Sequence, residues 1–476
     1  MKIKVNKTKI VATFGPACQQ EKTLLSMIAE GVDVFRFNFS HGTHDQHLAG
    51  VNIIRKVNEK HGLNIGILAD LQGPKIRLGI VANEFEMLKT GTMVTLTSQK
   101  GISTAERLCI SYDLLEKDVK PGEVILIDDG KVKVQVIRSN GKDAVLAKVI
   151  HGGKISSNKG VNFPQTKTTV PSLTPKDKKD LQFALETGFN WIALSFVRKA
   201  EDITALKKMV GKRNSYIKVM AKIEKPEALT ELDEIIRASD GIMIARGDLA
   251  VEVAQERMPL IQKDIIRRCL RFAKPVVVAT QMMESMIENP NPTRAEITDV
   301  ANAVIDGADA VMLSGETSTG KHPVKVIETM ESIIRNVEKG GFIYDKETKA
   351  DKNSSTFVSD AICYNAARIS GEVNARAITA MTFSGYTAFM LSSYRPRAKI
   401  FIFTENKELL NSLSICWGVY SFRYSKFVGT DTTIREIIGM MKKKKYLSPG
   451  DFVINVASMP LANRGRANML KVTVVE

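Results

Sequence analysis

The stretch from Ile217 to Ala250 constrains the fold of this chain more than any other. It reads IKVMAKIEKPEALTELDEIIRASDGIMIARGDLA, which is an apolar run, a helix-like segment and a second apolar run. This order predicts two parallel strands joined by a crossover helix, with their C-terminal ends side by side. Lys222 and Glu224 end the first run, and Asp248 ends the second. We therefore expect one ammonium and two carboxylates on one rim, a combination that suits a divalent cation and an anionic substrate.

The same alternation of strand and helix runs through most of the chain. Besides the two runs above, apolar runs occur in TKIVATF, VDVFRFNFS, NIGILADLQG, WIALSFVR, PVVVATQ and ADAVMLSGE. Eight such units predict a (β/α)8 TIM barrel, in which reactive groups lie at the C-terminal strand ends. A purely structural barrel does not need many polar residues on that rim. The polar residues expected there are Arg36, Asn38, Ser40, Asp70, Lys222, Glu224, Arg246, Asp248, Thr280, Ser314 and Glu316.

Two other regions depart from this alternation. About a hundred residues after the third barrel strand alternate apolar and polar positions around Asp129-Gly130 and Asn140-Gly141, which predicts hairpins and an inserted all-β lid domain. After a polar linker, strand patterns at AITAMTF, AKIFIFT, DFVINVA and LKVTVVE predict a smaller C-terminal α/β domain. The expected ranges are 1–73 and 171–345 for the barrel, 74–170 for the lid and 355–476 for the C-terminal domain.

Composition and charge narrow the classes of function. The five cysteines are scattered and have no CxxC spacing, which favours a reducing compartment over disulfides or a zinc site. We find no signal-peptide pattern and no apolar run of membrane-spanning length, so we expect a cytoplasmic protein without a membrane partner. The net charge of +16 suggests a nucleic-acid partner, but the lysines are spread along the chain and form no single binding patch. The cluster Lys442–Lys445 follows a helix pattern, where cations complement the helix C-terminus, so we expect no nucleic-acid partner.

One apparent nucleotide motif is incomplete. The segment from Gly315 to His322, GETSTGKH, nearly matches the phosphate loop G-x-x-x-x-G-K-[ST] and follows a predicted strand. The final position is His322, so the hydroxyl that would hold magnesium is missing. We do not interpret this segment as a phosphate loop.

Several motifs together resemble those of pyruvate kinase. They are KIVATFGPA, FRFNFSHGTHDQH, DLQGPKIRLG, VMAKIEKPEAL, IMIARGDLAVE, ATQMMESM, PTRAEITDVANAV and LSGETSTGKHPV, in the order of the family and over nearly the whole chain from Lys9. The resemblance implies transfer of the phosphoryl group of phosphoenolpyruvate to ADP, the last step of glycolysis, with Mg2+ or Mn2+ as cofactor. It also implies a homotetramer. Because the chain starts almost directly at the first barrel strand, we expect it to lack the short N-terminal domain of animal members.

The resemblance assigns roles to the rim residues. Glu224 and Asp248 would hold the divalent cation through hard carboxylate oxygens. Lys222 would neutralise the phosphoryl group during transfer and then the enolate oxygen. The backbone amides of Gly247 and Asp248 begin a helical turn and would bind the substrate carboxylate. Thr280 resembles the family residue that takes part in protonating the enolate, directly or through water.

Further positions would bind phosphate or line the nucleotide side. Arg36 and Arg77 would clamp phosphates, because a guanidinium fork matches phosphate geometry. Ser314 and Glu316 resemble residues around a water near Thr280. His41 could equally be structural. The positions expected to contact the nucleotide are Pro16, Asn38, His41, Arg77 and Lys176.

One group of residues bears on the monovalent cation. Many family members bind K+ beside residues that match Asn38, Ser40, Asp70 and the backbone of Leu71, and those enzymes carry a glutamate where this chain has Lys75. Gln72 and Lys75 resemble the branch that works without a monovalent cation. A lysine ammonium can supply the positive charge of the metal, so we expect activity without K+. The alternative is that Lys75 points to solvent.

The C-terminal segment resembles the regulatory domain of the family. The sequence TFSGYT matches its phosphate-binding loop, so a sugar-phosphate effector is a possible ligand, although turn chemistry explains the same residues. The later loop SMPLANRGRANML departs from the usual family pattern, and Arg464 and Arg466 could still engage phosphate. The candidate effector residues are Thr382, Ser384, Gly385 and Thr387.

Two alternatives remain open at the level of sequence. The first is another metal-dependent barrel enzyme that acts on phosphoenolpyruvate or pyruvate. The lid, Arg36, Arg77 and Lys176 favour ADP as second substrate over that alternative. The second is a basic, catalytically idle protein that binds polyanions. Such a protein would be free to lose Lys222 or the carboxylate pair, and this chain retains both.

Overall fold

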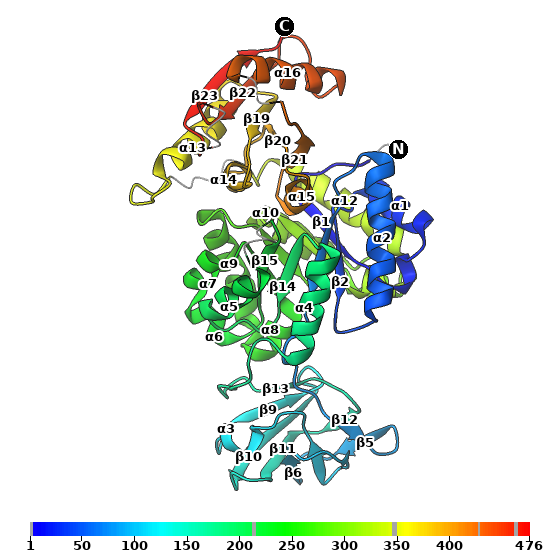
Figure 1. The fold of residues 1–476 in the computed structure, drawn as a ribbon. Helices are drawn as coiled ribbons and strands as arrows, with labels where there is room; N and C mark the ends of the chain where they lie inside the picture. Colours follow the sequence, from blue (N-terminus) through cyan, green and yellow to red (C-terminus); the bar gives the residue numbers. More distant parts are fainter. Residues whose placement is uncertain (1–2, 212–215, 345–349, 427–428, 461–464) are drawn as a thin grey trace.

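A computed structural model of the chain describes residues 3–211, 216–344, 350–426, 429–460 and 465–476. A closed barrel lies in the middle of the molecule, with the lid at one end and the C-terminal α/β domain at the other (Figure 1). The lid lies on the side of the C-terminal strand ends, so the predicted rim is between barrel and lid.

The barrel contains the eight predicted strands, and all neighbours pair in parallel, which confirms the expected (β/α)8 fold. The interiors of these strands are apolar and buried, as expected for a parallel sheet covered on both faces. In chain order the strands are β1 (Lys9–Thr13), β2 (Val34–Asn38), β3 (Gly66–Asp70), β14 (Trp191–Leu194), β15 (Lys218–Ile223), β16 (Gly241–Ala245), β17 (Val276–Ala279) and β18 (Ala310–Leu313).

Helices surround the barrel and pack their apolar faces against it. Their starts follow from local sequence: α10 begins after Thr293, whose hydroxyl accepts from the Glu296 amide while Glu296 reaches back to the Thr293 amide. The outer helices are α1 (Glu21–Glu30), α2 (His44–His61), α4 (Pro175–Thr187), α5 (Ala200–Val210), α6 (Pro226–Thr230), α7 (Leu232–Ala238), α9 (Met258–Arg271), α10 (Arg294–Asp306) and α12 (Pro323–Gly340).

The lid is mainly β-structure with its own apolar core. Both predicted turns are present, because Gly130 and Gly141 adopt positive φ between paired strands. The lid also contains one short helix, α3 (Leu115–Asp118), and it is therefore not strictly all-β. Its strands are β4 (Ile80–Val81), β5 (Phe85–Leu88), β6 (Met93–Thr97), β7 (Ile102–Ser103), β8 (Arg107–Cys109), β9 (Val124–Ile127), β10 (Val132–Ser139), β11 (Val145–His151), β12 (Gly153–Ser156) and β13 (Val161–Asn162).

The C-terminal domain is a five-stranded sheet in the order β21-β20-β19-β22-β23, with only β23 antiparallel. The four predicted strands are present. The fifth, β21, was missed because VYSFR mixes polar and aromatic residues. The strands are β19 (Ala377–Met381), β20 (Lys399–Thr404), β21 (Val419–Arg423), β22 (Phe452–Ala457) and β23 (Met469–Val474), and the helices are α13 (Phe357–Glu372), α14 (Tyr386–Ser393), α15 (Lys407–Ser412) and α16 (Thr430–Lys443).

A buried ion pair joins this domain to the bottom of the barrel. Arg395 Nη2 lies 2.8 Å from Asp309 Oδ2, and both side chains are almost fully buried. Asp309 Oδ1 also accepts from the Trp417 amide, and Trp191 Nε1 donates to the Ser412 carbonyl. The two domains therefore share a continuous packed interface at the end of the barrel opposite the rim.

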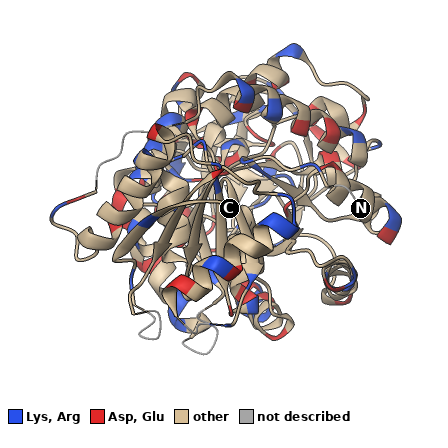
Figure 2. Cartoon of the chain, turned by 90° about the horizontal axis from the view of Figure 1, so that it is seen from above, with Lys and Arg blue, Asp and Glu red and all other residues tan. Residues whose placement is uncertain are grey.

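The positive charge is distributed over the molecule. In the view of Figure 2, lysine and arginine are interspersed with aspartate and glutamate over many helices. Lys442 and Lys443 lie in the last turn of α16, as the helix pattern predicted. In the parts of the chain that the structure describes, no helix is both long and apolar enough to cross a membrane.

Candidate active site

Three neighbouring barrel strands place the Lys222 ammonium at the centre of the rim. Lys222 Nζ lies 3.0 Å from Asp70 Oδ1 at the end of β3 and 2.9 Å from Glu224 Oε1 just after β15. It also donates to Ser195 Oγ, 2.7 Å away, after the end of β14. β3, β14 and β15 are adjacent in the barrel, so these contacts follow from the alignment of parallel strand ends.

These buried charges shift one another's pKa values. Burial would lower the pKa of Lys222, but the carboxylates of Asp70 and Glu224 outweigh it and the pKa is raised. Burial would raise the pKa of Asp70, but Lys222 and Arg36 outweigh it and the pKa is lowered. The pKa of Glu224 is raised, chiefly by burial and also by the charge of Asp248. Lys222 is therefore a permanent cation at neutral pH.

Arg36 adds a second fixed cation beside this cluster. Its Nε lies 2.6 Å from Asp70 Oδ2, and its Nη1 donates to Thr13 Oγ1 at 3.0 Å. Only 8% of Arg36 is exposed. Asp70 therefore holds both Arg36 and Lys222, and it orients two cations toward the same region of the rim.

Asp248 reaches the rim from α8 (Arg246–Glu252), which begins directly after β16. Asp248 Oδ1 lies 3.1 Å from Lys75 Nζ. The amide of Gly247 donates to Thr280 Oγ1 at 2.8 Å, so the predicted substrate-binding amide and Thr280 are in contact. Arg246 points away from the predicted site, to Asp299 on α10. Its role is to hold the loop after β17, because it also donates to the Thr280 carbonyl.

The predicted metal ligands fit a divalent cation. The charge of Asp248 raises the pKa of Glu224, so the two carboxylates are close enough to repel, and each now holds a lysine ammonium. A divalent cation would relieve the repulsion through hard oxygen ligands, and substrate and water would supply the remaining ligands. Among the residues that the structure describes, no group of three or more His, Cys, Asp or Glu side chains is placed to hold a metal.

Thr280 adopts an unusual backbone conformation that Glu316 supports. Thr280 has φ of 69°, in the left-handed region, and its hydroxyl donates to the Ala279 carbonyl at 2.6 Å. Glu316 is buried, and it accepts from the Ser314 amide at 2.7 Å and from the Met283 amide at 3.2 Å. Burial raises the pKa of Glu316. Glu316 therefore joins the rim after β18 to the loop that carries Thr280.

The predicted nucleotide side contains a second group of cations. Lys176 Nζ lies 2.6 Å from Asp180 Oδ2 and 2.6 Å from the Phe39 carbonyl. Arg77 Nη1 donates to the Asn158 carbonyl of the lid at 2.9 Å. The pKa of His41 is lowered by burial and by nearby Arg77, Arg36 and Lys75, which favours a neutral imidazole. Pro16 begins a short 3-10 helix, η1 (Pro16–Cys18).

Only some of the residues expected near K+ contact one another. Asn38 Oδ1 accepts from the Ser40 amide at 3.1 Å, and the Leu71 carbonyl accepts from Ser195 Oγ at 2.7 Å. Asp70 already pairs with Arg36 and Lys222. The ammonium of Lys75 lies at Asp248, and among the described residues it forms no ion pair with Asp70.

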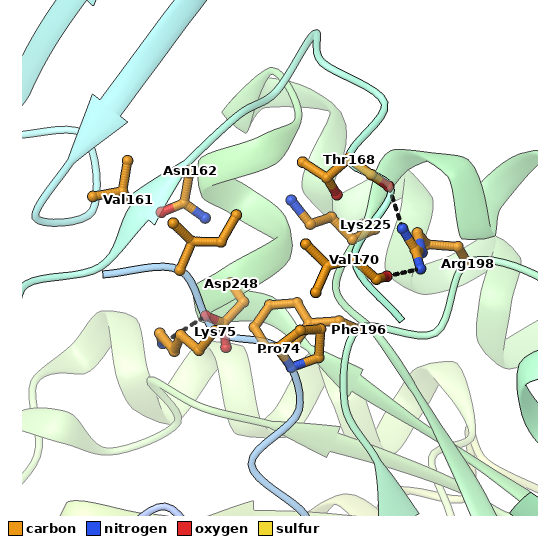
Figure 3. Close-up of a pocket in the computed structure, with 11 residues that line it drawn as sticks. Pro74, Lys75, Val161, Asn162, Thr168, Val170, Phe196, Arg198, Lys225 and Asp248 are labelled. Carbon is orange, nitrogen blue, oxygen red and sulfur yellow. Dashed lines mark hydrogen bonds and ion pairs between the residues drawn. The ribbon is translucent and has the colours of Figure 1, made fainter. Parts of the chain in front are cut away.

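A narrow cavity separates barrel and lid, and Lys75 and Asp248 face each other on its wall (Figure 3). Four contacts of the residues that line this cavity were not predicted from the sequence. Lys225 Nζ lies 2.6 Å from Glu252 Oε1, which also accepts from Asn162 of the lid at 2.8 Å. Arg198 donates to the carbonyls of two lid residues, as Figure 3 shows. Lys225 directly follows the predicted metal ligand Glu224, so its place near the site could have been predicted. Nothing in the sequence links Glu252 to Asn162.

The candidate effector loop is a tight turn that begins α14. The Gly385 amide donates to Thr382 Oγ1 at 3.0 Å, and Gly385 has φ of 89°. The Tyr386 hydroxyl lies 2.9 Å from Thr356 Oγ1, and the Arg466 guanidinium lies 5.7 Å from the Tyr386 ring centroid. The Ser384 hydroxyl accepts from the Tyr386 amide, and Thr387 is buried. Arg464 lies outside the described residues.

The fold and the site together define a class of protein. It is the class of (β/α)8 barrel proteins that gather buried charged groups at the C-terminal rim, where barrel enzymes place their active sites. Comparisons with known proteins identify the family within this class. Residues 5–327 match the family model "Pyruvate kinase, barrel domain", and residues 360–473 match "Pyruvate kinase, alpha/beta domain".

Whole-chain relatives agree with these matches. A pyruvate kinase of Corynebacterium glutamicum is 43% identical over 98% of this chain and 97% of its own length. One from Geobacillus stearothermophilus is 38% identical over 98% of this chain and 80% of its own length. A crystal structure of a pyruvate kinase from Cryptosporidium parvum superposes with a TM-score of 0.91, at 34% identity, over 98% of this chain and 96% of that one.

The chain belongs to the pyruvate kinase family, as its motifs predicted. Members of this family are phosphotransferases that bind phosphoenolpyruvate and ADP and generally use Mg2+ and K+.

Proposed function

We propose that the rim described above carries out the family reaction, transfer of the phosphoryl group of phosphoenolpyruvate to ADP. The observation that carries this proposal is the cluster of Lys222, Asp70 and Glu224, with Asp248 entering from the next strand. Phosphoryl transfer requires positioning and neutralisation of charge, and this cluster supplies both from buried, mutually oriented groups.

Glu224 and Asp248 would hold Mg2+ or Mn2+, which when bound neutralises phosphate and enolate charge. Lys222 presents a fixed ammonium to the phosphoryl group during transfer and to the enolate oxygen afterwards. Arg36, held by Asp70, binds the phosphate. The Asp248 amide at the start of α8 would bind the substrate carboxylate, together with the Gly247 amide, which in the free protein donates to Thr280 Oγ1.

We assign protonation of the enolate to the side of the site where Thr280 lies. Its hydroxyl already accepts from the Gly247 amide and donates to a carbonyl, so its position is fixed. Glu316 and the Ser314 amide hold the neighbouring loop. The proton reaches the enolate from the Thr280 hydroxyl or from a water bound beside it.

For ADP we propose the side lined by Pro16, Asn38, His41, Arg77 and Lys176. Arg77 and Lys176 bind phosphate. Arg77 belongs to the lid segment, where its guanidinium donates to the Asn158 carbonyl of the same segment. The Lys176→Ala variant should raise the KM for ADP while leaving the KM for phosphoenolpyruvate nearly unchanged. An equal rise in both values would contradict the assignment.

We further propose that the enzyme does not require K+. Two observations support this: Asp70 already carries two cations, and Lys75 supplies a positive charge at the rim.

Beyond the catalytic site, we propose a cytoplasmic homotetramer. The loop with Thr382, Ser384, Gly385 and Thr387 is the proposed binding site for a phosphorylated effector.

The test is ATP formation from phosphoenolpyruvate and ADP with Mg2+, in tetramethylammonium buffer with and without KCl. Strong activity in both conditions supports the reaction and the role of Lys75. Activity only with KCl keeps the reaction and refutes K+ independence. No activity in either condition, with a folded protein, refutes the proposed reaction. The Asp248→Asn and Glu224→Gln variants are the controls and should lose activity.

A further inference from the structure

Each predicted metal ligand carries one lysine in this structure, but the two lysines are held very differently. Lys222, paired with Glu224, contacts three side chains and has only 11% of its side chain exposed. Lys75, paired with Asp248 at 3.1 Å, has 32% of its side chain exposed. Asp248 is the only carboxylate that pairs with Lys75 among the described residues. Lys75 is therefore the lysine that can leave its carboxylate at low cost, because partly exposed ion pairs are weak.

We propose that Lys75 competes with the divalent cation for Asp248. This inference rests on the proposed role of Asp248 as a metal ligand. A divalent cation held by Asp248 would lie beside the Lys75 ammonium, which is 3.1 Å from Asp248 Oδ1. A divalent cation and an ammonium beside one carboxylate repel each other strongly in a partly buried site. Asp248 therefore binds either the Lys75 ammonium or the metal, and metal binding releases Lys75.

The structure also provides a place for the released ammonium. Lys75 lines the narrow cavity next to Asp248, and it lines a second hollow of about 520 Å³. The second hollow is also lined by Lys176, whose ammonium lies 2.6 Å from Asp180, and by the Ser111 hydroxyl, and both groups can donate to phosphate. A released Lys75 would join Lys176 there and increase the positive charge that faces a nucleoside diphosphate.

This arrangement makes Lys75 a positioning residue that links two ligands. In the metal-free protein its charge is neutralised by Asp248 and is not available to an anion. When the metal occupies Asp248, the same charge becomes available to phosphate. The metal should therefore strengthen binding of ADP to the protein, and linkage requires that ADP strengthens binding of the metal by the same factor.

The first test measures Mn2+ binding to the full-length protein without substrates, by electron paramagnetic resonance of free Mn2+. The Lys75→Met variant should bind Mn2+ about fivefold more tightly than the wild type, which is the factor expected for loss of one partly exposed ion pair. The Lys75→Arg variant keeps the charge and should stay within about twofold of the wild type. The Arg77→Met variant removes a cation that binds a carbonyl, and it should also stay within twofold.

The second test measures the coupling between Mn2+ and ADP. In the wild type, saturating Mn2+ should lower the Kd of ADP, and Lys75→Met should reduce that effect. Unchanged Mn2+ affinity in Lys75→Met would overturn the inference. An equal gain in Arg77→Met would also overturn it, because the effect would then be general charge repulsion.

The Asp248→Asn variant separates this inference from the proposed function. If Asp248→Asn loses Mn2+ binding and Lys75→Met has no effect, only the competition is refuted. If Asp248→Asn binds Mn2+ as the wild type does, the metal role of Asp248 fails and both proposals fall. Circular dichroism of each variant confirms that the fold is retained.

Discussion

Removal of the Lys222 ammonium should reduce both turnover and stability. The Lys222→Met variant keeps the apolar stem but leaves Glu224 buried at 1% exposure without its cation. Removing one partner of a buried ion pair lowers the unfolding free energy by about 3–5 kcal/mol. Asp70 keeps Arg36 as a partner, so we expect the unfolding free energy to fall by the lower end of this range, about 3 kcal/mol. Turnover should fall by about a thousandfold or more, because a preorganised charge at the reacting phosphoryl group is lost.

A second substitution tests the electrostatic reason. In Lys222→Met/Glu224→Gln the uncompensated carboxylate is gone, and glutamine can still accept from the Phe196 amide that now binds Glu224 at 2.6 Å. The double variant should recover about 2 kcal/mol of the unfolding free energy, but none of the turnover. Urea unfolding followed by tryptophan fluorescence is a suitable assay, because Trp191 lies on β14 next to β15.

A surface ion pair provides the control for this reasoning. Lys325 and Glu328 pair at 3.0 Å with about half of each side chain exposed, so Lys325→Met should change stability by less than about 1 kcal/mol. Metal binding should persist in Lys222→Met, which Mn2+ titration can measure. The reasoning is refuted if Lys222→Met is as stable as Lys325→Met, or if the double variant is no more stable than Lys222→Met.

Three further predictions concern other parts of the molecule. The Thr280→Val variant should lower kcat by about a hundredfold with little change in the KM for phosphoenolpyruvate. Steady-state kinetics measures both constants, and a rise in KM as large as the fall in kcat would indicate a binding defect instead. Burial raises the pKa of Cys18 to about 11 from its ordinary value near 9. The folded form therefore keeps a proton that the unfolded form loses, and stability falls by about 3 kcal/mol as the pH rises through this range. As the pH rises, the urea midpoint of unfolding should fall less in Cys18→Ala than in the wild type. An equal dependence of the midpoint on pH in both proteins would contradict the assignment to Cys18. The Arg395→Met variant leaves Asp309 buried and unpaired, so the unfolding free energy should drop by about 3–5 kcal/mol in urea titration, and a change below 1 kcal/mol would show that the pair contributes little.

Much of the site could be predicted because the barrel obeys a simple geometric rule. Parallel strands end on the same rim, so residues that end successive apolar runs must come together. This rule placed Lys222, Asp70 and Glu224 in one region, and the structure puts the first within 3.0 Å of the other two. The same rule included Arg246, which the structure turns outward to Asp299. Position on a rim does not fix the direction of a side chain.

The sequence by itself determined the barrel, the existence of the β-rich insert and the family, because these depend on local periodicity and on motifs. The tertiary structure alone decided which charges pair across the cavity. The pairing of Lys75 with Asp248 and the contact of Asn162 with Glu252 join the lid segment to the barrel over sequence separations of 173 and 90 residues. Such contacts depend on how the lid packs over the rim, and no local pattern in the chain encodes that packing.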